Sequence, residues 1–214
     1  GQCHFPDYDA STDYEDTLYA EFYRDYPNFI GFNYCEQFWG FESADFPVTP
    51  IERYEHFAKL LELGDRYGGY LVVSWCGNQW SPAINPMAML KQVPAFEEAC
   101  GKYTQNDILC EKYTQTSYLS DMESLVLGTW LSGYCGQFGV RYDESGWTDA
   151  EGEGQEEYRL STSLAVDFER FALNGMTVVD GPELIWVSDF RELPPSVGED
   201  GYAKRGWKTQ PEFE

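Results

Sequence analysis

Short runs of β-forming residues alternate along this chain with longer segments in which apolar residues recur every three or four positions. The short runs predict five strands, at about residues 29–35, 70–75, 107–110, 137–142 and 176–179. The longer segments predict five helices, at about residues 16–23, 50–64, 86–102, 121–131 and 163–173. Strand and helix thus follow one another about five times, which indicates a parallel sheet built from βα units.

The predicted helix after the first strand has clear boundary signals. Thr49 is placed to be its N-cap, Pro50 suits the first helical position, and Glu52 completes a capping box. Gly64 is predicted to end the helix. The apolar positions of this helix predict its buried face: Ile51, Tyr54, Ala58 and Leu61.

The sequence lacks a phosphate-binding loop, which favours a TIM-type barrel over a doubly wound parallel sheet. A doubly wound sheet ordinarily carries G-x-G-x-x-G or a P-loop after its first strand, and the sequence has neither. Several predicted strands instead end in polar or acidic residues, which is typical of a (β/α)8 TIM-type barrel. Because a complete barrel takes about 250 residues or more, we expect residues 1–214 to form one α/β domain with the five or so C-terminal βα units. The first units then lie upstream of Gly1 or are replaced by irregular structure.

The charge of the chain narrows the class of partner. It has 37 Asp and Glu residues against 14 Lys and Arg residues, a formal net charge of -23, so nucleic acid and anionic membranes would be repelled. A neutral carbohydrate meets no such repulsion, and the 17% aromatic content supplies flat rings that suit sugars. No apolar run approaches the roughly 18 residues that span a bilayer, and no signal peptide opens the chain.

Histidine and cysteine give little support to metal or nucleophilic chemistry. The two histidines, His4 and His56, occur in unrelated contexts, and the six cysteines show neither zinc-ligand spacing nor a C-x-x-C pair. The acidic segment 148–160 does not match the pattern of a calcium-binding loop, because the last ligand position would be Leu160. We therefore expect no metal, no cofactor, and few or no disulfides.

Carboxylates stand at or just past the ends of several predicted strands. They are Glu36, Glu111, Asp143 and Glu183, with Asp180 close to the last. Carboxylates gathered on one rim beside Trp and Tyr suit hydrolysis of a glycosidic bond, in which one acid protonates the leaving oxygen and another carboxylate activates water or attacks carbon. Such carboxylates would equally suit metal binding or ion pairs with Arg141 and Lys112. Glu36 taken alone would also suit a solvated loop.

Several short motifs follow one another in a recognisable order between about residues 26 and 187. They are Tyr26-Pro27-Asn28-Phe29-Ile30-Gly31 running into Cys35-Glu36-Gln37-Phe38-Trp39, then Tyr67-Gly68-Gly69-Tyr70 before Ser74-Trp75, then Leu127-Gly128-Thr129-Trp130-Leu131-Ser132-Gly133, and Asn174-Gly175 before Glu183. In this order they resemble the catalytic module of glycoside hydrolase family 98. The resemblance implies a (β/α)8 barrel, an inverting endo-glycosidase, and secretion or a cell-surface location in a bacterium.

The resemblance also assigns roles to individual residues. It places the general acid at Glu36, and the pair that holds and deprotonates water at Asp143 and Glu183. Asp180 is a rival for Glu183, because the local sequence differs in length from the family pattern. Asp121 is a weaker rival for Asp143, since a predicted helix N-cap position gives it a structural role. The residues predicted to bind substrate are Trp39, Trp75, Asn78, Trp80, Glu111, Lys112, Arg141, Tyr142, Trp147 and Trp186.

The predicted partner is an oligosaccharide or polysaccharide, and three functions remain open. Known members of the family resembled include endo-β-1,4-galactosidases that release blood-group or Lewis-type oligosaccharides, which is the function we expect. Others are endo-β-1,4-xylanases acting on branched glucuronoarabinoxylan, which is the enzymatic alternative. A non-catalytic carbohydrate-binding barrel fragment is the alternative from another class.

Overall fold

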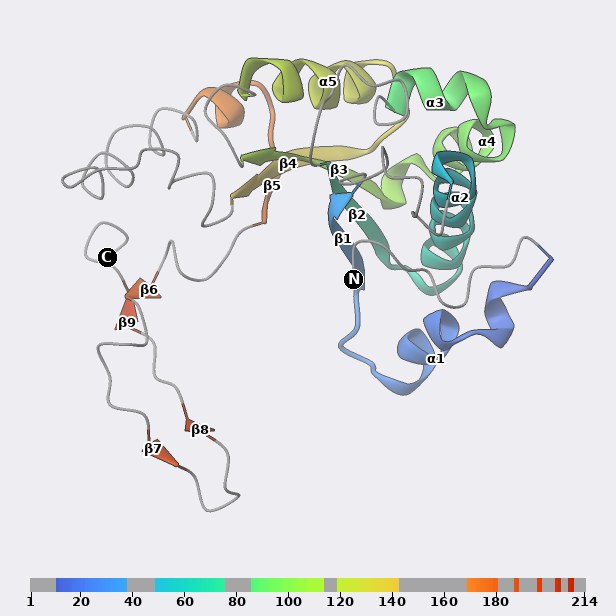
Figure 1. Ribbon diagram of the computed structural model, residues 1–214, viewed down its shortest axis with the longest axis horizontal. Coiled ribbons are helices and arrows are strands. Elements are labelled where there is room, and N and C mark those ends of the chain that lie inside the picture. The colour runs from blue at the N-terminus through green and yellow to red at the C-terminus, as the bar shows by residue number, and fades with distance from the viewer. Residues whose placement is uncertain are drawn as a thin grey trace.

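Five parallel strands form the centre of the molecule (Figure 1). The computed structural model describes residues 11–37, 49–75, 86–113, 119–142 and 169–180, and the two-residue strands at 187–188, 196–197, 203–204 and 208–209. The five strands are β1 (Gly31–Gln37), β2 (Tyr70–Trp75), β3 (Asp107–Tyr113), β4 (Gln137–Tyr142) and β5 (Val178–Asp180). They lie side by side in the order in which they occur in the chain. This order has no switch point of the doubly wound type, so it confirms the predicted partial TIM-type barrel.

The sheet is curled enough for its two edge strands to face each other. Asn33 Nδ2 of β1 donates a hydrogen bond of 2.8 Å to Asp180 Oδ2 of β5. Three other strands separate β1 from β5 in the sheet, so this contact crosses the concave face directly. The described strands therefore form part of a barrel wall, with Asn33 and Asp180 on its inside.

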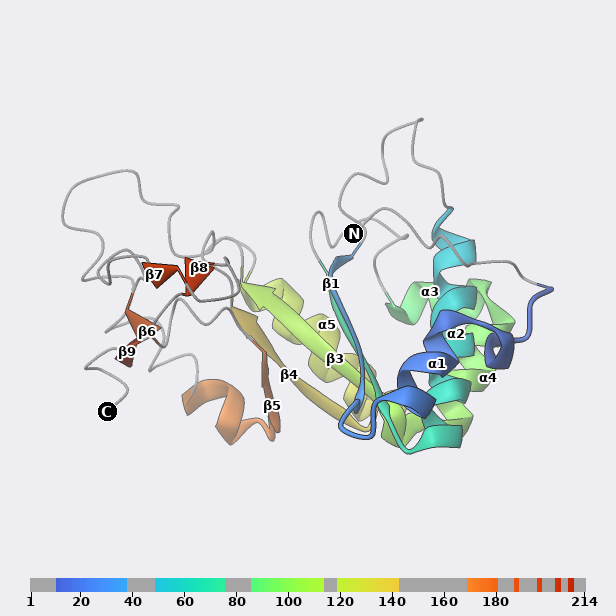
Figure 2. The same cartoon turned by 90° about the horizontal axis from the view of Figure 1, so that it is seen from below.

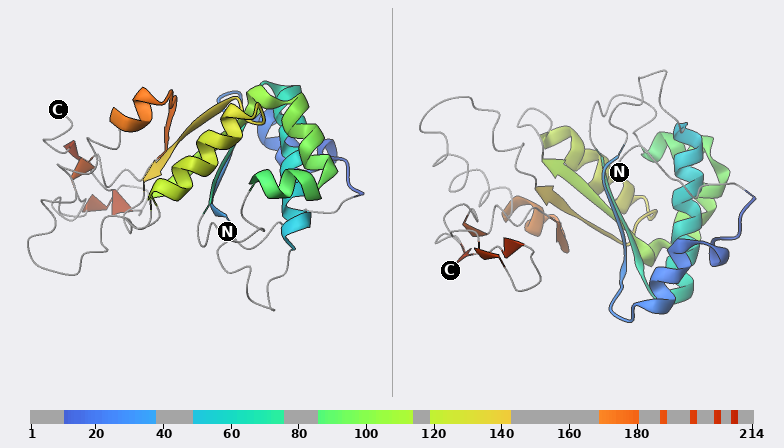
Figure 3. Two further views of the ribbon diagram at one scale, coloured as in Figure 1. Left: turned by 90° about the horizontal axis from the view of Figure 1, so that it is seen from above. Right: turned by 60° about the horizontal axis from the view of Figure 1, so that its bottom comes forward.

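Helices cover the outer face of this wall (Figure 3). The helix α2 (Pro50–Tyr67) joins β1 to β2, α3 (Pro86–Gln92) and α4 (Pro94–Lys102) join β2 to β3, and α5 (Leu119–Leu131) joins β3 to β4. Residues 169–173 are helical and precede β5. Alternate strand residues pack with these helices into one core, which includes Leu71, Val73, Leu109 and Phe138 from the strands and Tyr54, Phe57, Leu61, Phe96 and Val126 from the helices.

Two small antiparallel ladders follow β5. The strand β6 (Val187–Ser188) pairs with β9 (Lys208–Thr209), and β7 (Ser196–Val197) pairs with β8 (Ala203–Lys204). An irregular tail was expected here, and these four strands are the part of it that the structure describes.

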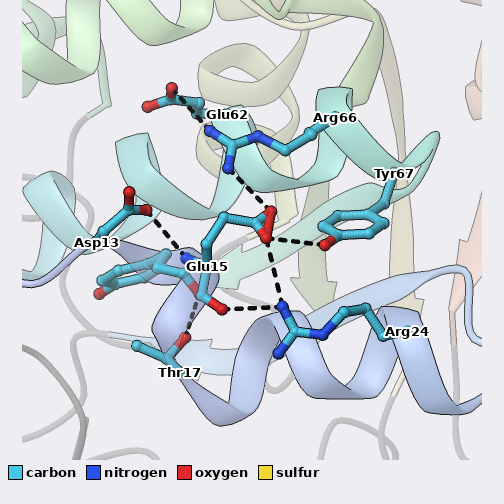
Figure 4. A network of polar contacts seen from close by, with 8 residues as sticks. Asp13, Glu15, Thr17, Arg24, Glu62, Arg66 and Tyr67 are labelled. Carbon is cyan, nitrogen blue, oxygen red and sulfur yellow. Dashed lines mark hydrogen bonds and ion pairs between the residues drawn. The ribbon is translucent and has the colours of Figure 1, made fainter.

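An N-terminal segment is tied to the outer layer through Glu15 (Figure 4). It consists of the 3-10 turn η1 (Tyr14–Asp16) and the helix α1 (Leu18–Asp25). Glu15 accepts a hydrogen bond of 2.8 Å from the Tyr67 hydroxyl and forms ion pairs with Arg66 at 2.9 Å and Arg24 at 3.4 Å. Burial opposes ionisation of Glu15, but the hydrogen bonds from Tyr67 and Arg66 outweigh it and lower its pKa. The carboxylate therefore stays charged and joins α1 to the end of α2.

The start of α2 confirms its prediction, whereas its end corrects one. The Thr49 hydroxyl accepts from the Glu52 backbone N–H at 3.2 Å, and the Thr49 N–H donates to Glu52 Oε2 at 2.7 Å, so the capping box is present. Gly64 does not end the helix. The helix continues to Tyr67 and stops at Gly68, whose φ of 75° lies in the left-handed region that favours glycine.

The buried face of α2 is close to the predicted one. Tyr54, Ala58 and Leu61 are buried, but Ile51 is 49% exposed. The packed face therefore begins at Arg53 and Tyr54, after the first residues of the helix.

Three other boundaries differ from the predicted ones. The helix expected at 86–102 is broken into α3 and α4, because Pro94 has no N–H to continue the ladder and Val93 before it has non-helical angles. The helix expected at 16–23 is α1, which begins at Leu18 after the turn η1. The helix α5 begins two residues before Asp121, so the prediction that Asp121 is its N-cap is wrong, and Asp121 remains a rival for Asp143.

Three strands run further toward their C-terminal ends than predicted, and β5 does so by one residue, Asp180. β1 reaches Gln37, and β3 reaches Tyr113 because Lys112 and Tyr113 continue the ladder opposite Arg141 and Tyr142. Glu36 and Glu111 therefore lie inside strands rather than just past them.

Candidate active site

The C-terminal ends of β1 to β5 lie along one edge of the curled sheet (Figure 2). The ladder pairs Gln37 with Trp75, Lys112 with Arg141, and Arg141 with Asp180. The predicted site residues that the structure places in these strand ends are Glu36, Trp75, Glu111, Lys112, Arg141 and Tyr142. Residues that are far apart in sequence thus share the edge at which barrel enzymes build their sites.

The other predicted site residues lie outside the described residues. They are Trp39, Asn78, Trp80, Asp143, Trp147, Glu183 and Trp186. Asp143 follows the last residue of β4 directly, and Glu183 follows the last residue of β5 by three positions. The catalytic roles of Glu36, Asp143 and Glu183 therefore stay predictions.

The backbone of β1 is irregular next to Glu36. Tyr34 pairs with Val73, and the next registered pair is Gln37 with Trp75, so three steps along β1 match two along β2. An extra residue of this kind is a β-bulge, which is common beside active sites. Side chains that alternate between the two faces of the sheet up to Tyr34 therefore do not keep that alternation as far as Gln37.

Asp180 joins side chains from three strands on the concave face. Its Oδ2 atom lies 2.5 Å from Arg141 Nη1 of β4, and the same oxygen accepts the hydrogen bond from Asn33 of β1. The side chains of Arg141 and Asp180 are 18% and 19% exposed, so solvent weakens this ion pair only in part. Arg141 was predicted to bind substrate or to pair with a strand-end carboxylate, and the structure shows the second of these contacts.

Asn33 was missed by sequence reasoning. A signal was present, because Asn33 is an amide between two aromatic residues of a strand, Phe32 and Tyr34. Successive residues of a strand point to opposite faces of the sheet. If the two aromatic residues pack on helices, the amide between them lies on the other face. What the sequence did not show is that this face closes on β5.

A hollow of about 470 Å³ lies on the concave face and is lined mainly by residues at the N-terminal ends of the strands. Its lining combines apolar side chains with a few polar ones: Ile30, Gly31, Phe32, Asn33, Tyr70, Val72, Ile108, Gln137, Val178, Val179 and Asp180. Cys110 is fully buried beside it, and burial together with the Asp180 carboxylate raises the pKa of its thiol. A thiol held protonated in this way is a poor nucleophile.

His56 lies behind β1, on the helix side of the sheet. Its Nε2 atom is 2.8 Å from the Tyr34 hydroxyl, and its Nδ1 atom contacts the Tyr14 hydroxyl. Burial, with smaller contributions from Arg53 and Lys59, lowers the pKa of His56 to about 3. A neutral, fully enclosed imidazole between two tyrosines fixes η1, α2 and β1 together, and it has no access to a substrate at the strand ends.

The described residues contain no group of three or more His, Cys, Asp or Glu side chains that could hold a metal ion. In the same part of the chain, no helix is both long enough and apolar enough to cross a membrane.

The curled parallel sheet, with polar residues at the C-terminal ends of its strands, defines a protein of the TIM-barrel class. A family model described as glycosyl hydrolase family 98 matches residues 1–214, and the chain belongs to this family. No curated protein matches the sequence.

Three similar solved structures are of the catalytic module of a family 98 glycoside hydrolase from Streptococcus pneumoniae TIGR4. The native form and the complex with the LewisY pentasaccharide blood group antigen each give a TM-score of 0.56 at 22% identity. The complex with the H-disaccharide blood group antigen gives 0.55 at 23% identity. These matches cover 76%, 75% and 75% of this chain and 29% of those chains, so the chain spans less than a third of their length. At this identity, the likeness shows the fold.

Proposed function

We propose that the protein is an inverting endo-glycoside hydrolase that cleaves internal β-1,4 bonds of branched glycans. The observation that carries the proposal is the meeting of β1, β4 and β5 through Asn33, Arg141 and Asp180 in a chain of this family. Glu36 lies in β1, Asp143 directly follows β4, and Glu183 follows the last residue of β5 by three positions.

The proposed roles follow from what hydrolysis with inversion requires. Glu36 gives a proton to the leaving oxygen, and Asp143 with Glu183 holds and deprotonates the attacking water. An inverting enzyme keeps its acid and its base about 6.5–9.5 Å apart so that water fits between them. Glu36 also needs a pKa raised by its surroundings, because an ordinary Glu is ionised at neutral pH.

Replacing Glu36 with Gln tests the general acid. The amide keeps the shape of the side chain but has no acidic proton, so we expect kcat to fall by about 10²–10⁴-fold while glycan binding persists. Hydrolysis is followed by release of reducing ends, and binding by calorimetry. Glu21→Gln in the exposed part of α1 is the matched control and should hydrolyse like the unaltered protein. Equal turnover by Glu36→Gln would remove Glu36 from the proposal, and binding without cleavage by the unaltered protein would favour a carbohydrate-binding module.

For the substrate, we propose blood-group-type oligosaccharides cleaved at an internal β-1,4 galactosidic bond. The support is that two of the similar solved structures hold blood group antigens. The test is product analysis by mass spectrometry on a blood-group glycan and on glucuronoarabinoxylan side by side. Cleavage of the xylan alone would instead assign an endo-β-1,4-xylanase.

The stereochemistry has its own test. Proton NMR of the first product distinguishes the two anomers before they equilibrate, and inversion at a β-linked substrate yields the α-anomer. A first-formed β-anomer would contradict the inverting mechanism while leaving the substrate assignment intact.

We also propose that the protein is secreted or held at the cell surface. Branched glycans of the kind proposed lie outside the cell, and a strongly acidic chain gains solubility there. Detection of the protein in washed cells and culture medium, against a cytoplasmic marker, checks this location.

A further inference from the structure

We propose that Asp180 is a positioning residue that holds β1 and β4 against β5 beneath the reacting groups. Its role is to fix the spacing between the general acid and the residues that activate water. This inference rests on the function proposed above, and it gives Asp180 a different part from that of a rival catalytic base.

One carboxylate oxygen of Asp180 contacts side chains from two other strands. Asp180 Oδ2 accepts from Asn33 Nδ2 at 2.8 Å and lies 2.5 Å from Arg141 Nη1. β5 pairs with β4 in the ladder and β1 pairs with β2, so the bond from Asn33 spans the concave face and joins residues that are 147 positions apart in sequence. A guanidinium, a carboxylate and an amide in this arrangement give charge-assisted bonds, which are short and directional.

Each of these three residues also lies close in sequence to a proposed catalytic residue. Asn33 precedes Glu36 by three positions, Arg141 precedes Asp143 by two, and Asp180 precedes Glu183 by three. An extended chain advances at most about 3.6 Å per residue, so each proposed catalytic residue has its Cα atom within about 11 Å of one member of this network. The three side chains thus stand on the three strands from which the proposed acid and base extend.

The Asp180 carboxylate is also held in a part-buried position. The side chains of Arg141 and Asp180 are 18% and 19% exposed, and Asp180 Oδ2 contacts both Arg141 and Asn33, so a shift of Asp180 would disturb its contacts with β1 and β4 together. Catalysis that depends on an acid and a base separated by a fixed gap is sensitive to misplacement by about 1 Å. The network is built to prevent such misplacement.

The test is a double-mutant cycle on turnover with Asn33→Ala, Asp180→Asn and the double variant. Asn33→Ala removes the donor of one link, and Asp180→Asn removes the charge that strengthens the same link. We therefore expect each single variant to lower kcat by about 10–100-fold with KM changed less than about threefold. The double variant should be no worse than the more damaged single variant. Both limbs of the pH–rate profile should remain, since the proton-transferring groups are intact.

A matched control comes from the opposite end of the same strand pair. Thr177 Oγ1, just before β5, donates to Oε1 of Gln137, the first residue of β4, at 3.0 Å. Thr177→Val removes that bond. At a loss of thermal stability equal to that of Asn33→Ala, it should still keep the kcat of the unaltered protein. If Asn33→Ala does not fold, Asn33→Ser, whose hydroxyl is too short to reach across, carries the same comparison.

The outcomes separate this inference from the proposed function. Hydrolysis by the unaltered protein, its loss in Glu36→Gln, and a full kcat in a folded Asn33→Ala variant would overturn the positioning role alone. Additive losses in the double variant would do the same. Loss of one pH limb in Asp180→Asn would make Asp180 the base itself, and an unaltered protein that cleaves no glycan would overturn both proposals.

Discussion

Asp107 is a buried carboxyl group at the first position of β3, with 2% of its surface exposed. Its Oδ2 atom accepts a weak hydrogen bond from the Cys100 thiol at 3.8 Å, and burial raises its pKa from 3.8 to about 8. Between these two pH values the unfolded chain has released the proton while the folded chain keeps it. The contribution of Asp107 to the free energy of unfolding therefore falls as the pH rises from about 4 to 8.

Asp107→Asn should remove this pH dependence. The amide has the shape of the protonated acid and does not ionise. Between pH 4 and 8, the drop in the free energy of unfolding should therefore be smaller in the variant than in the unaltered protein, by on the order of a few kcal/mol. Urea unfolding at several pH values measures the effect. Asp25→Asn, at an exposed position, should leave the dependence unchanged. An Asp107→Asn variant whose stability falls as steeply with pH as that of the unaltered protein would contradict the buried, protonated acid.

Single residues show where sequence reasoning stops. Acidic residues at strand ends were predicted, and Asp180 was named among them, because strand ends can be found from the apolar pattern. Its contact with Asn33 was not predictable, since it depends on how tightly the sheet curls across 147 residues of sequence. The enclosure of His56 between Tyr14 and Tyr34 was missed for the same reason.

At the scale of elements, β4 and β5 approach each other closely because Gly139 has no side chain. A Cβ atom at position 139 would lie 2.1 Å from the Val178 carbonyl oxygen, a backbone atom that moves only with its strand. Gly139→Ala should therefore push β5 away from β4 and weaken the Arg141–Asp180 pair. We expect a loss of about 1–3 kcal/mol in stability together with lower turnover.

The control for this prediction is a glycine in open surroundings. A Cβ atom at Gly101 in α4 meets no atom within 4 Å, so Gly101→Ala should be neutral or slightly stabilising. Thermal unfolding and kcat, measured for both variants, test whether only Gly139→Ala loses stability and turnover. Equal stability of both variants would show that β5 is free to shift.

Elements were predictable to the extent that local signals specify them. The Thr49–Glu52 capping box located the start of α2, and β2 and β4 have the predicted bounds. The errors came from signals that compete with periodicity. Pro94 divides a segment of continuous helical spacing, and Gly68, not Gly64, adopts the left-handed conformation that ends α2.

At the scale of the whole molecule, the net charge of -23 implies self-repulsion that salt should relieve. Raising the ionic strength from about 10 to 200 mM should raise Tm by about 2–5 °C, because screening weakens repulsion among exposed carboxylates. Calorimetric scans in sodium chloride and in choline chloride check that ionic strength, not a particular cation, is responsible. A Tm that falls with salt would mean that attractive ion pairs such as those of Glu15 outweigh the repulsion.

The architecture as a whole was predicted more securely than the site. Repeated strand and helix signals, without a phosphate loop, were enough to indicate a partial barrel, and the sheet order confirms it. The site depends on loops that follow the strands, where composition leaves many conformations open. Sequence reasoning could name candidates there, such as Asp143 and Glu183, but not their distances.

The sequential order of the strands has a consequence for how the protein folds. Each of β2 to β5 pairs with the strand made just before it, so the sheet can grow in the direction of synthesis, one βα unit at a time. The hydrogen bond between Asn33 and Asp180 is different, because it joins the first of these strands to the last. A nascent chain can therefore hold a well-packed outer layer while the edge proposed for catalysis is still open, and the arrival of β5 completes that edge.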